Sequence, residues 1–486
     1  MPYFFTSSSH VFRHKEALRE LGFDVSELLS GTLALPEGTP FFVDEDMRPA
    51  EPMCSYFFEL AKHVEAESLR DYAYDMMTLD DFLARVLDPP ADLLSATEED
   101  LVAFRRWRTQ LSPAPVGPAT WRRNRVAING FYDWAASAGL VERRPYARRR
   151  NGRDALSWGA TVDLDVRHLS RAQYLMLHRV GLGGDRPDGT PDPGFRQAFR
   201  LRNMVAAELA VTTGMRLREF SCLLDMEVPR PSPSAGGVPV ALGAIAKYGY
   251  HRVVMVQQRV LRSLELYRRT ERAAQVLKSR KALWHCREEL FVVDDVDERR
   301  MRLSGRMHGR RRSFDVMAMS APLRRIAVLE AERGLEPLAL FVGRGGRMLS
   351  ASRWQQVFNA AAERARVMSD AWGGVQMPRQ VRIHDLRHTF AVFMLRLLTE
   401  QVIEDERRRR EAGGSGAWLM EHVARSPLLI LQRLLGHRDP RNTMKYLRYL
   451  EDVNALVARA VEEWTREDRT FADYSAQLAS RGSGSE

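Results

Sequence analysis

Apolar residues at helical spacing run through most of this 486-residue chain, and only one stretch clearly alternates in the manner of strands. Residues 55–87 and 97–111 carry apolar side chains at i, i+3 and i+4, which is the spacing of an amphipathic helix. Residues 238–257 (VPVALGAIAKYGYHRVVMVQ) alternate instead and are rich in valine and isoleucine, which predicts a strand, a turn and a second strand. We therefore expect a mainly α-helical protein with a small antiparallel sheet.

Helix start signals occur in the first third of the chain. Thr97 precedes three acidic residues, which favours it as an N-cap because the positive end of a helix dipole attracts acids. Thr120 is predicted to open the next helix, with Val126, Phe131 and Trp134 facing inward.

A chain of this length exceeds what one compact core accommodates, so we expect more than one domain. The sequence predicts an N-terminal arm over residues 1–50, a helical domain over 51–145 and a basic linker over 146–164. A second, larger domain is expected over 165–465, and residues 466–486 form a C-terminal tail.

The charge balance points to an anionic partner. The net charge is +10 and the pI is about 9.7, which favours a polyanion such as nucleic acid over a merely solvated surface. Six lysines stand against 67 arginines, so a lysine at a conspicuous position carries unusual weight.

The cysteine spacing and the hydropathy of the sequence indicate the compartment in which the protein resides. Three widely spaced cysteines form no CxxC pair, so neither a disulfide framework nor a thiolate metal site is expected. No stretch reaches the roughly 18 apolar residues needed to span a bilayer, and the N-terminus lacks a signal-peptide layout. We expect a cytoplasmic protein with no membrane partner.

Four segments of the second domain hold polar residues that a helix or strand core would not require. They read TTGMRLREF, AIAKYGYHR, RIHDLRHTF and LLGHRDPRNTMKY, and the residues concerned are Arg216, Lys247, His384, Arg387, His388, His437 and Tyr446. Taken singly, each has an ordinary structural explanation, such as a solvated helix cap. His384 and His388 could also ligate a metal at i, i+4 spacing. Because Arg387 lies between them and no acidic third ligand is in view, we predict no metal.

Together these residue types suit phosphoryl transfer without a metal. Guanidinium groups bind two phosphate oxygens at once and stabilise the charge that builds on them in the transition state. A tyrosine with a pKa near 10 is ionised in only about one molecule in a thousand at pH 7, which costs roughly 4 kcal/mol unless a base or positive charge assists. A lysine can protonate the leaving oxygen, so no cofactor is predicted.

The segments TGMRLREF, HDLRHTF and LLGHRDPRNTMKY resemble, in order, the three signature boxes of the tyrosine recombinase (phage integrase) family. The resemblance covers residues 165–465, and the helical segment before it looks like that family's core-binding domain. It implies a helical, SAM-like DNA-binding domain over 51–145 and an α+β catalytic domain with a small antiparallel sheet.

By position, the resemblance makes Arg216 and Arg387 the two catalytic arginines and Glu219 the acid that supports Arg216. His384 takes the place of the general base or acid, and His437 that of the residue that donates to the phosphate.

The remaining residues follow from the same resemblance. Tyr446 takes the place of the nucleophile, with Tyr449 as its rival. Lys247 matches the general-acid lysine, although its turn reads AKYGYHR where the family has a glycine-rich turn. His388 is expected to support the helix.

The function implied is site-specific recombination or integration of double-stranded DNA through a covalent 3′-phosphotyrosine, needing neither metal nor ATP. Four protomers would act on two DNA sites. Alternatives are a type IB topoisomerase-like nicking-closing enzyme and a catalytically silent DNA-binding accessory protein. Residues 285–335 and 400–425 look like insertions, and the amphipathic residues 452–478 could dock on a neighbouring protomer or pack on their own domain.

Overall fold

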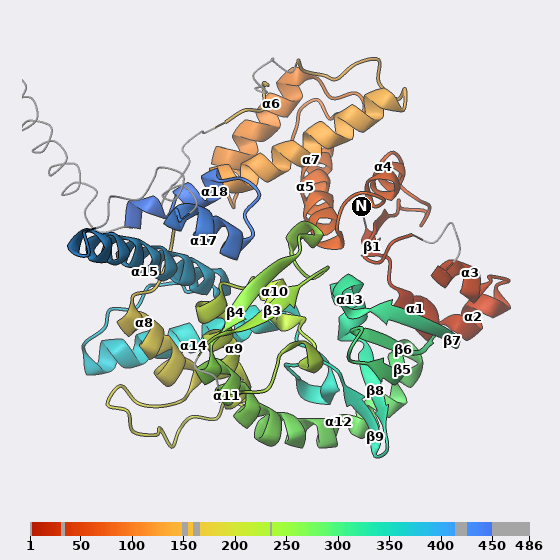
Figure 1. The fold of residues 1–486 in the computed structure, drawn as a ribbon. Coiled ribbons are helices and arrows are strands. Elements are labelled where there is room, and N and C mark those ends of the chain that lie inside the picture. The colour runs from red at the N-terminus through yellow and green to blue at the C-terminus, as the bar shows by residue number, and fades with distance from the viewer. Residues whose placement is uncertain are drawn as a thin grey trace, which may run out of the picture. The chain divides into compact units, whose positions relative to one another are not determined.

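The computed structural model of the 486-residue chain describes residues 2–30, 35–147, 154–158, 166–233, 236–413 and 425–449. The chain forms two compact units, Met1–Asp163 and Leu164–Glu486 (Figure 1). The predicted tail, the amphipathic residues 452–478 and most of the predicted linker lie outside the described residues.

The N-terminal unit is mainly helical. Its strands β1 and β2 pair antiparallel, with Phe4 opposite Phe41. In chain order its elements are β1 (Tyr3–Phe5), α1 (Ser8–Arg13), α2 (Lys15–Glu20), α3 (Val25–Ser30), β2 (Pro40–Phe42), α4 (Met53–Leu60), α5 (Ala66–Arg85), α6 (Glu98–Arg106), the π-helix η1 (Trp107–Leu111) and α7 (Pro118–Ser137).

Local sequence signals predicted the start of α6 correctly and the start of α7 incorrectly. Thr97 forms a capping box with Asp100, as predicted. The prediction for Thr120 was wrong, because α7 begins at Pro118 after the N-cap Gly117. Proline suits the first turn, since the N–H that it lacks would have no partner there. Phe131 is buried, but Val126, which we predicted to face inward, is 50% exposed.

The helices of the C-terminal unit include α9, which packs against α11 and α15. They are α8 (Arg171–Leu175), the π-helix η2 (Met176–Leu182), α9 (Arg200–Thr213), α10 (Leu217–Ser221), η3 (Asp225–Glu227), α11 (Gln258–Tyr267), the π-helix η5 (Arg268–Arg272), α12 (Ala273–His285), η6 (Arg287–Glu289), η7 (Val316–Ala318), α13 (Ala321–Arg325), η8 (Arg344–Gly346), α14 (Ala351–Trp372), α15 (Ile383–Glu411), α17 (Pro427–Leu435), α18 (Arg441–Met444) and η9 (Leu447–Tyr449).

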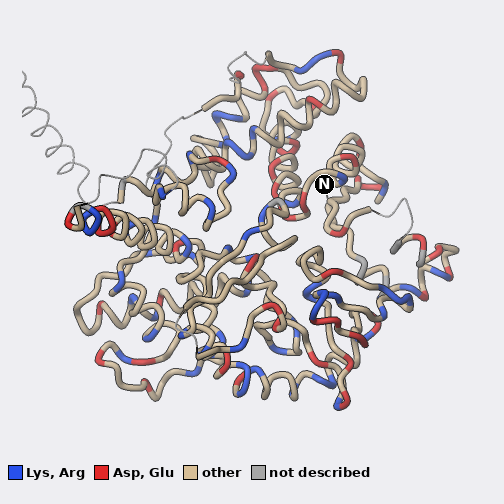
Figure 2. Tube along the Cα trace, viewed as in Figure 1, with Lys and Arg blue, Asp and Glu red and all other residues tan. Residues whose placement is uncertain are grey.

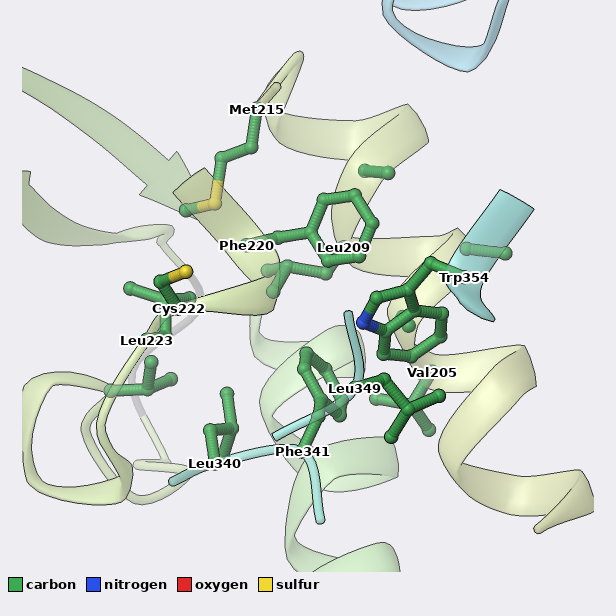
Figure 3. Packing of buried hydrophobic residues seen from close by; sticks show 14 of the residues in the cluster. Val205, Leu209, Met215, Phe220, Cys222, Leu223, Leu340, Phe341, Leu349 and Trp354 are labelled. Carbon is green, nitrogen blue, oxygen red and sulfur yellow. The ribbon is translucent and has the colours of Figure 1, made fainter. Parts of the chain in front are cut away.

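An aromatic cluster fills the centre of this unit. The ring of Trp354 on α14 meets Phe220 and Phe341 edge-on, at centroid distances of 5.6 and 5.8 Å (Figure 3). Val205 and Leu209 reach the same cluster from α9. The middle of α9 is thereby held against a close-packed core, which resists small shifts.

The predicted strand–turn–strand is present. Strands β3 (Val238–Leu242) and β4 (Arg252–Val256) pair antiparallel, with Leu242 opposite Arg252. The turn between them contains the short helix η4 (Lys247–Gly249).

Residues 291–337 form a second sheet, which we did not predict. Its strands are β5 (Phe291–Asp297), β6 (Arg302–Met307), β7 (Arg310–Asp315), β8 (Ala327–Ala331) and β9 (Gly334–Pro337). Their order is β7-β6-β5-β8-β9, and β5 and β8 run parallel while the other neighbours are antiparallel. The segment that looked like an insertion near 285–335 is therefore a folded layer. Among the described helices, none combines the length and the apolar character needed to cross a bilayer.

Candidate active site

The site begins where α9 ends. Gly214 adopts the left-handed conformation (φ 63°), and a Cβ at this position would lie 2.3 Å from the Phe390 ring of α15. Glycine therefore permits both the turn and the close approach of α15. Two residues later, Arg216 is the N-cap of α10.

Glu219 links two arginines. Its carboxylate is fully buried and accepts from the Arg216 backbone N–H at 2.7 Å, from the Arg216 guanidinium at 3.0 Å and from Arg252 at 2.5 Å. Burial acts to raise the pKa of Glu219, but the positive charges of Arg252 and Arg216 hold it below its usual value. The carboxylate thus holds the guanidinium groups of Arg216 and Arg252 in place.

Arg252 was not predicted as a site residue. It is buried at the start of β4, and besides Glu219 it donates to the carbonyl oxygen of Leu434 at the end of α17. A signal was present: alternation along β4 predicts that Arg252, Val254 and Val256 share a face, and the two valines are buried. An arginine on the inward face of a strand requires a carboxylate or carbonyl partner.

Arg387 crosses from α15 to the ends of two other helices. Its side chain is only 2% exposed and donates to the carbonyl oxygens of Gly214 and Leu435, both at 2.5 Å. The last carbonyls of a helix have no partner within it, so the guanidinium satisfies acceptors at the C-terminal ends of both α9 and α17. Arg216 approaches the same place, since it donates to Gly436 at 3.5 Å. The two arginines therefore converge on the end of α17.

His437 follows directly from this helix end. Gly436 caps α17 in the left-handed conformation (φ 61°), and the next residue, His437, pairs its Nδ1 with the hydroxyl of Thr443 at 2.9 Å. Burial and the charges of Arg387 and Arg216 lower the pKa of His437 to about 3. The imidazole is therefore neutral at pH 7.

Tyr446 lies against this group. Its side chain is 1% exposed, its ring stacks on His437 at 6.4 Å, and its hydroxyl lies 2.8 Å from Nδ1 of His388. Burial raises the pKa of Tyr446 to about 12, although Arg387 and Arg216 act to lower it. Ionising the phenol at pH 7 would cost about 7 kcal/mol without a proton acceptor.

The two histidines of α15 sit together, but only His388 contacts the phenol among the hydrogen bonds of the described residues. Their rings meet edge-on at 4.5 Å. Burial, His384 and Lys445 lower the pKa of His388 to about 2, so its imidazole is uncharged at pH 7. In the tautomer protonated on Nε2, its Nδ1 accepts the hydrogen bond of the phenol. His384 is exposed to solvent, yet desolvation by nearby protein atoms and the charge of Arg387 lower its pKa to about 4. We predicted a supporting role for His388, whereas it lies closest to Tyr446.

Two lysines approach from different elements. Lys247 is exposed on the β3–β4 turn, close enough to His384 for its charge to lower that residue's pKa. Lys445, which we had not singled out, lies with its Nζ 5.2 Å from the centre of the Tyr446 ring. Burial and Arg387 lower the pKa of Lys445. Its position beside Tyr446 in a lysine-poor chain was a usable signal.

Tyr449 contacts Val166 and His168. Its hydroxyl accepts from the backbone N–H of Val166 at 2.7 Å and donates to the carbonyl of Val166 at 3.1 Å. Its ring packs edge-on against His168 at 4.7 Å. These contacts tie it to the start of the C-terminal unit.

The described residues contain no group of three or more His, Cys, Asp or Glu side chains positioned to hold a metal ion. The residues that the structure does gather are Arg216, Glu219, Arg252, His384, Arg387, His388, His437, Lys445 and Tyr446, with Lys247 at their edge. We call this set the Tyr446 cluster. It places two guanidinium groups and a phenol with a neutral proton acceptor within one small volume.

No protein-family model matches the sequence, and no curated protein matches it. Among solved structures, the chain is similar to the XerH site-specific recombinase bound to its difH substrate in a pre-cleavage complex, with a TM-score of 0.44 and 14% identity over 84% of this chain and 83% of that one.

It is also similar to the Tn1549 transposon integrase in complex with transposon right end DNA, with a TM-score of 0.44 and 13% identity over 85% of this chain and 98% of that one. A lambda integrase dimer bound to a core site gives a TM-score of 0.40 and 12% identity over 81% and 92% of the two chains. These three solved proteins are named as a recombinase and two integrases.

Proposed function

We propose that this protein is a site-specific DNA recombinase of the tyrosine recombinase type, with Tyr446 as its nucleophile. One observation carries the proposal: Arg216 and Arg387 converge on the end of α17, where His388 holds the hydroxyl of Tyr446 at 2.8 Å. Guanidinium groups beside a phenol and a neutral base meet the needs of attack on a phosphodiester.

In the proposed reaction the phenol oxygen of Tyr446 attacks phosphorus as its proton passes to Nδ1 of His388. The bond from phosphorus to the 5′ oxygen breaks, and Lys247 protonates that oxygen, which leaves as a 5′-hydroxyl. The products are a 3′-phosphotyrosine and a free strand end. Attack by another strand's 5′-hydroxyl reverses the sequence and rejoins the DNA, so neither ATP nor a metal is required.

Because the phenol is buried, the proposed reaction requires a conformational change. Tyr446 is 1% exposed and packs with Phe390, Leu395, Leu431 and Leu435. A phosphodiester therefore reaches it only when the segment after α17 moves outward. Such gating is a common property of enzymes that assemble their site on substrate binding.

Charge supports DNA as the partner. Beyond the net charge of +10, the hairpin of β6 and β7 carries five exposed arginines, namely Arg302, Arg306, Arg310, Arg311 and Arg312. The basic positions along this hairpin are blue in Figure 2. Such side chains neutralise phosphates and release counterions, which favours binding at low salt. We propose that four protomers act together on two DNA sites, with the N-terminal helical unit holding DNA as well.

The proposal is tested with a duplex that carries a nick next to the scissile phosphate, so that the cleaved strand is lost and the protein stays attached. The sequences that flank the gene for the protein supply the candidate duplexes. Wild type and Tyr449→Phe should give an SDS-resistant adduct in EDTA without ATP, and Tyr446→Phe should give none. An adduct that survives in Tyr446→Phe and disappears in Tyr449→Phe would refute the assignment.

The buried phenol also favours a second candidate, a DNA-binding protein without catalysis. Its pKa of about 12 is what an inert core tyrosine would show. A protein of this kind would bind the duplex and form no adduct in any variant, so the same experiment separates the two.

A further inference from the structure

A cavity of about 570 Å³ lies at the opposite end of α9 from the Tyr446 cluster. Residues 197–199 and Arg202, at the start of α9, form one wall, and residues 343–350 and the first turns of α14 form the other. We call it the α9–α14 cavity. Its volume falls within the roughly 300–1,000 Å³ typical of small-molecule sites.

The charged side chains that line this cavity are all positive among the described residues. Its lining contains Arg202, Arg344, Arg347 and Arg353, and no acidic side chain from the described residues. Arg344 makes no hydrogen bond or ion pair with the described part of the chain, and it is exposed. Arg347 pairs at 3.5 Å with Glu289, which lies outside the lining. Like charges this close repel one another unless an anion lies between them.

Among the arginines that line the cavity, Arg202 gives the strongest indication of an anionic ligand. It is only 3% exposed, and it forms no ion pair with any described residue. Its guanidinium donates to the side-chain oxygen of Asn203, at 3.1 and 2.8 Å, and to the carbonyl of Val342 at 3.0 Å. Three of its five N–H groups are thereby used within the described residues. A buried charge without a counterion is costly, and an anionic ligand would remove that cost.

The neighbouring carboxylate does not fill this role. Glu271 lies near Arg202, but its two oxygens accept the backbone N–H groups of Leu201 and Arg202, at 3.0 and 2.9 Å. It therefore caps the N-terminus of α9. Within the described residues, two N–H groups of the Arg202 guanidinium make no hydrogen bond, and Arg202 forms part of the cavity wall.

The backbone around Arg202 is also unusual. Phe199 has a positive φ of 62°, a conformation that costs a non-glycine residue free energy and that often occurs at ligand sites. Its ring lies 4.3 Å from the Arg202 guanidinium carbon, which fixes the direction of that side chain. On the facing wall, the N-cap Ser350 opens the 22-residue helix α14, whose dipole favours an anion at this end.

From these observations we propose that the α9–α14 cavity binds phosphate groups of a ligand with an apolar body, of which a nucleoside triphosphate is the fitting class. The arginines and the start of α14 hold the phosphates. Phe199, Met348 and Val357 provide the apolar wall for a planar group. The site is separate from the Tyr446 cluster, because Arg202 and Thr213 are about 17 Å apart along α9. It does not depend on the chemistry proposed for Tyr446.

The test is calorimetric titration of the full-length protein with ATP, inorganic triphosphate and adenosine, without added metal. The variant Arg344→Gln with Arg353→Gln removes two exposed arginines and leaves the core intact. A matched control, Arg299→Gln with Arg333→Gln, removes two exposed arginines of the same unit that do not line the cavity. ATP and triphosphate should bind to wild type and control, and ATP should bind the cavity variant about ten- to a hundredfold more weakly.

Adenosine alone should not bind measurably. A duplex oligonucleotide identifies the source of the phosphate: if only duplex binding falls in the cavity variant, the DNA backbone supplies the phosphates and the nucleoside triphosphate is excluded. The inference is overturned if ATP, triphosphate and duplex each bind all three proteins equally, or if ATP and triphosphate fail to bind wild type and duplex binding is unchanged. Arg202→Gln provides a second variant, read only if its melting temperature matches wild type.

Discussion

The Nδ1 atom of His388 lies 2.8 Å from the hydroxyl of Tyr446, although the two residues are 58 positions apart. His384, one turn earlier on α15, shares its surroundings without this contact in the described structure. The histidine that directly contacts the phenol is therefore the one we expected only to support the helix.

If His388 accepts the phenol proton, His388→Ala should slow formation of the covalent adduct by about 10²- to 10⁴-fold, the usual contribution of a positioned base. His384→Ala should have a smaller effect on cleavage. Single-turnover rates with saturating protein on the nicked duplex measure both variants, and unchanged melting temperatures serve as the control. Equal rates for His388→Ala and wild type would exclude this role.

The histidines of the site should make folding stability depend on pH. His388, His437 and His384 have pKa values of about 2, 3 and 4 in the folded protein, against about 6.5 when unfolded. Below pH 6.5 the unfolded chain binds protons that the folded chain does not. The stability that these groups contribute is complete above pH 6.5 and is lost as pH falls toward the folded values.

The melting temperature of wild type should therefore decrease between pH 7 and pH 5. His388→Gln removes one of these groups and should show a shallower decrease over the same interval. Differential scanning calorimetry in buffers of equal ionic strength measures the difference, and parallel curves for the two proteins would contradict it.

Neutralising Glu219 should strongly destabilise the fold. Glu219→Gln leaves the buried guanidinium of Arg252, and that of Arg216 beside it, without their shared carboxylate, at a cost of about 3–5 kcal/mol. Urea unfolding measures this loss. The control is Glu404→Gln, a change in a carboxylate that pairs with Arg407 and Arg408 on the surface of α15, and it should shift stability by no more than about 0.5 kcal/mol.

The two lysines of the site can be distinguished by the leaving group. If Lys247 protonates the 5′ oxygen, Lys247→Ala should cleave a substrate with a bridging 5′ sulfur at nearly the wild-type rate, because a thiolate leaves without a proton. Lys445→Ala should stay slow on both substrates, since Lys445 lies over the Tyr446 ring. Rescue of Lys445→Ala alone would transfer the general-acid role to that residue.

Local patterns in the sequence predicted what depends on neighbouring residues. Helical periodicity, the capping box at Thr97 and the alternation in residues 238–257 depend on contacts within a few positions or across one turn, so α6 and the β3–β4 pair were predictable. The three segments that resemble the signature boxes of the tyrosine recombinase family also contain most residues of the Tyr446 cluster.

Only the tertiary structure determined which residues that are distant in the sequence contact one another. Glu219 and Arg252 are 33 residues apart, and their contact exists because β4 packs beside α9 and α17. The same packing selects His388 over His384 as the contact of Tyr446 and engages Tyr449 with Val166. The five-stranded sheet likewise depends on β5 and β8 pairing in parallel across intervening strands. Side-chain spacing along one helix or strand carries no information about which distant backbone carbonyl or carboxylate will face it, so these relationships follow only from how the elements pack.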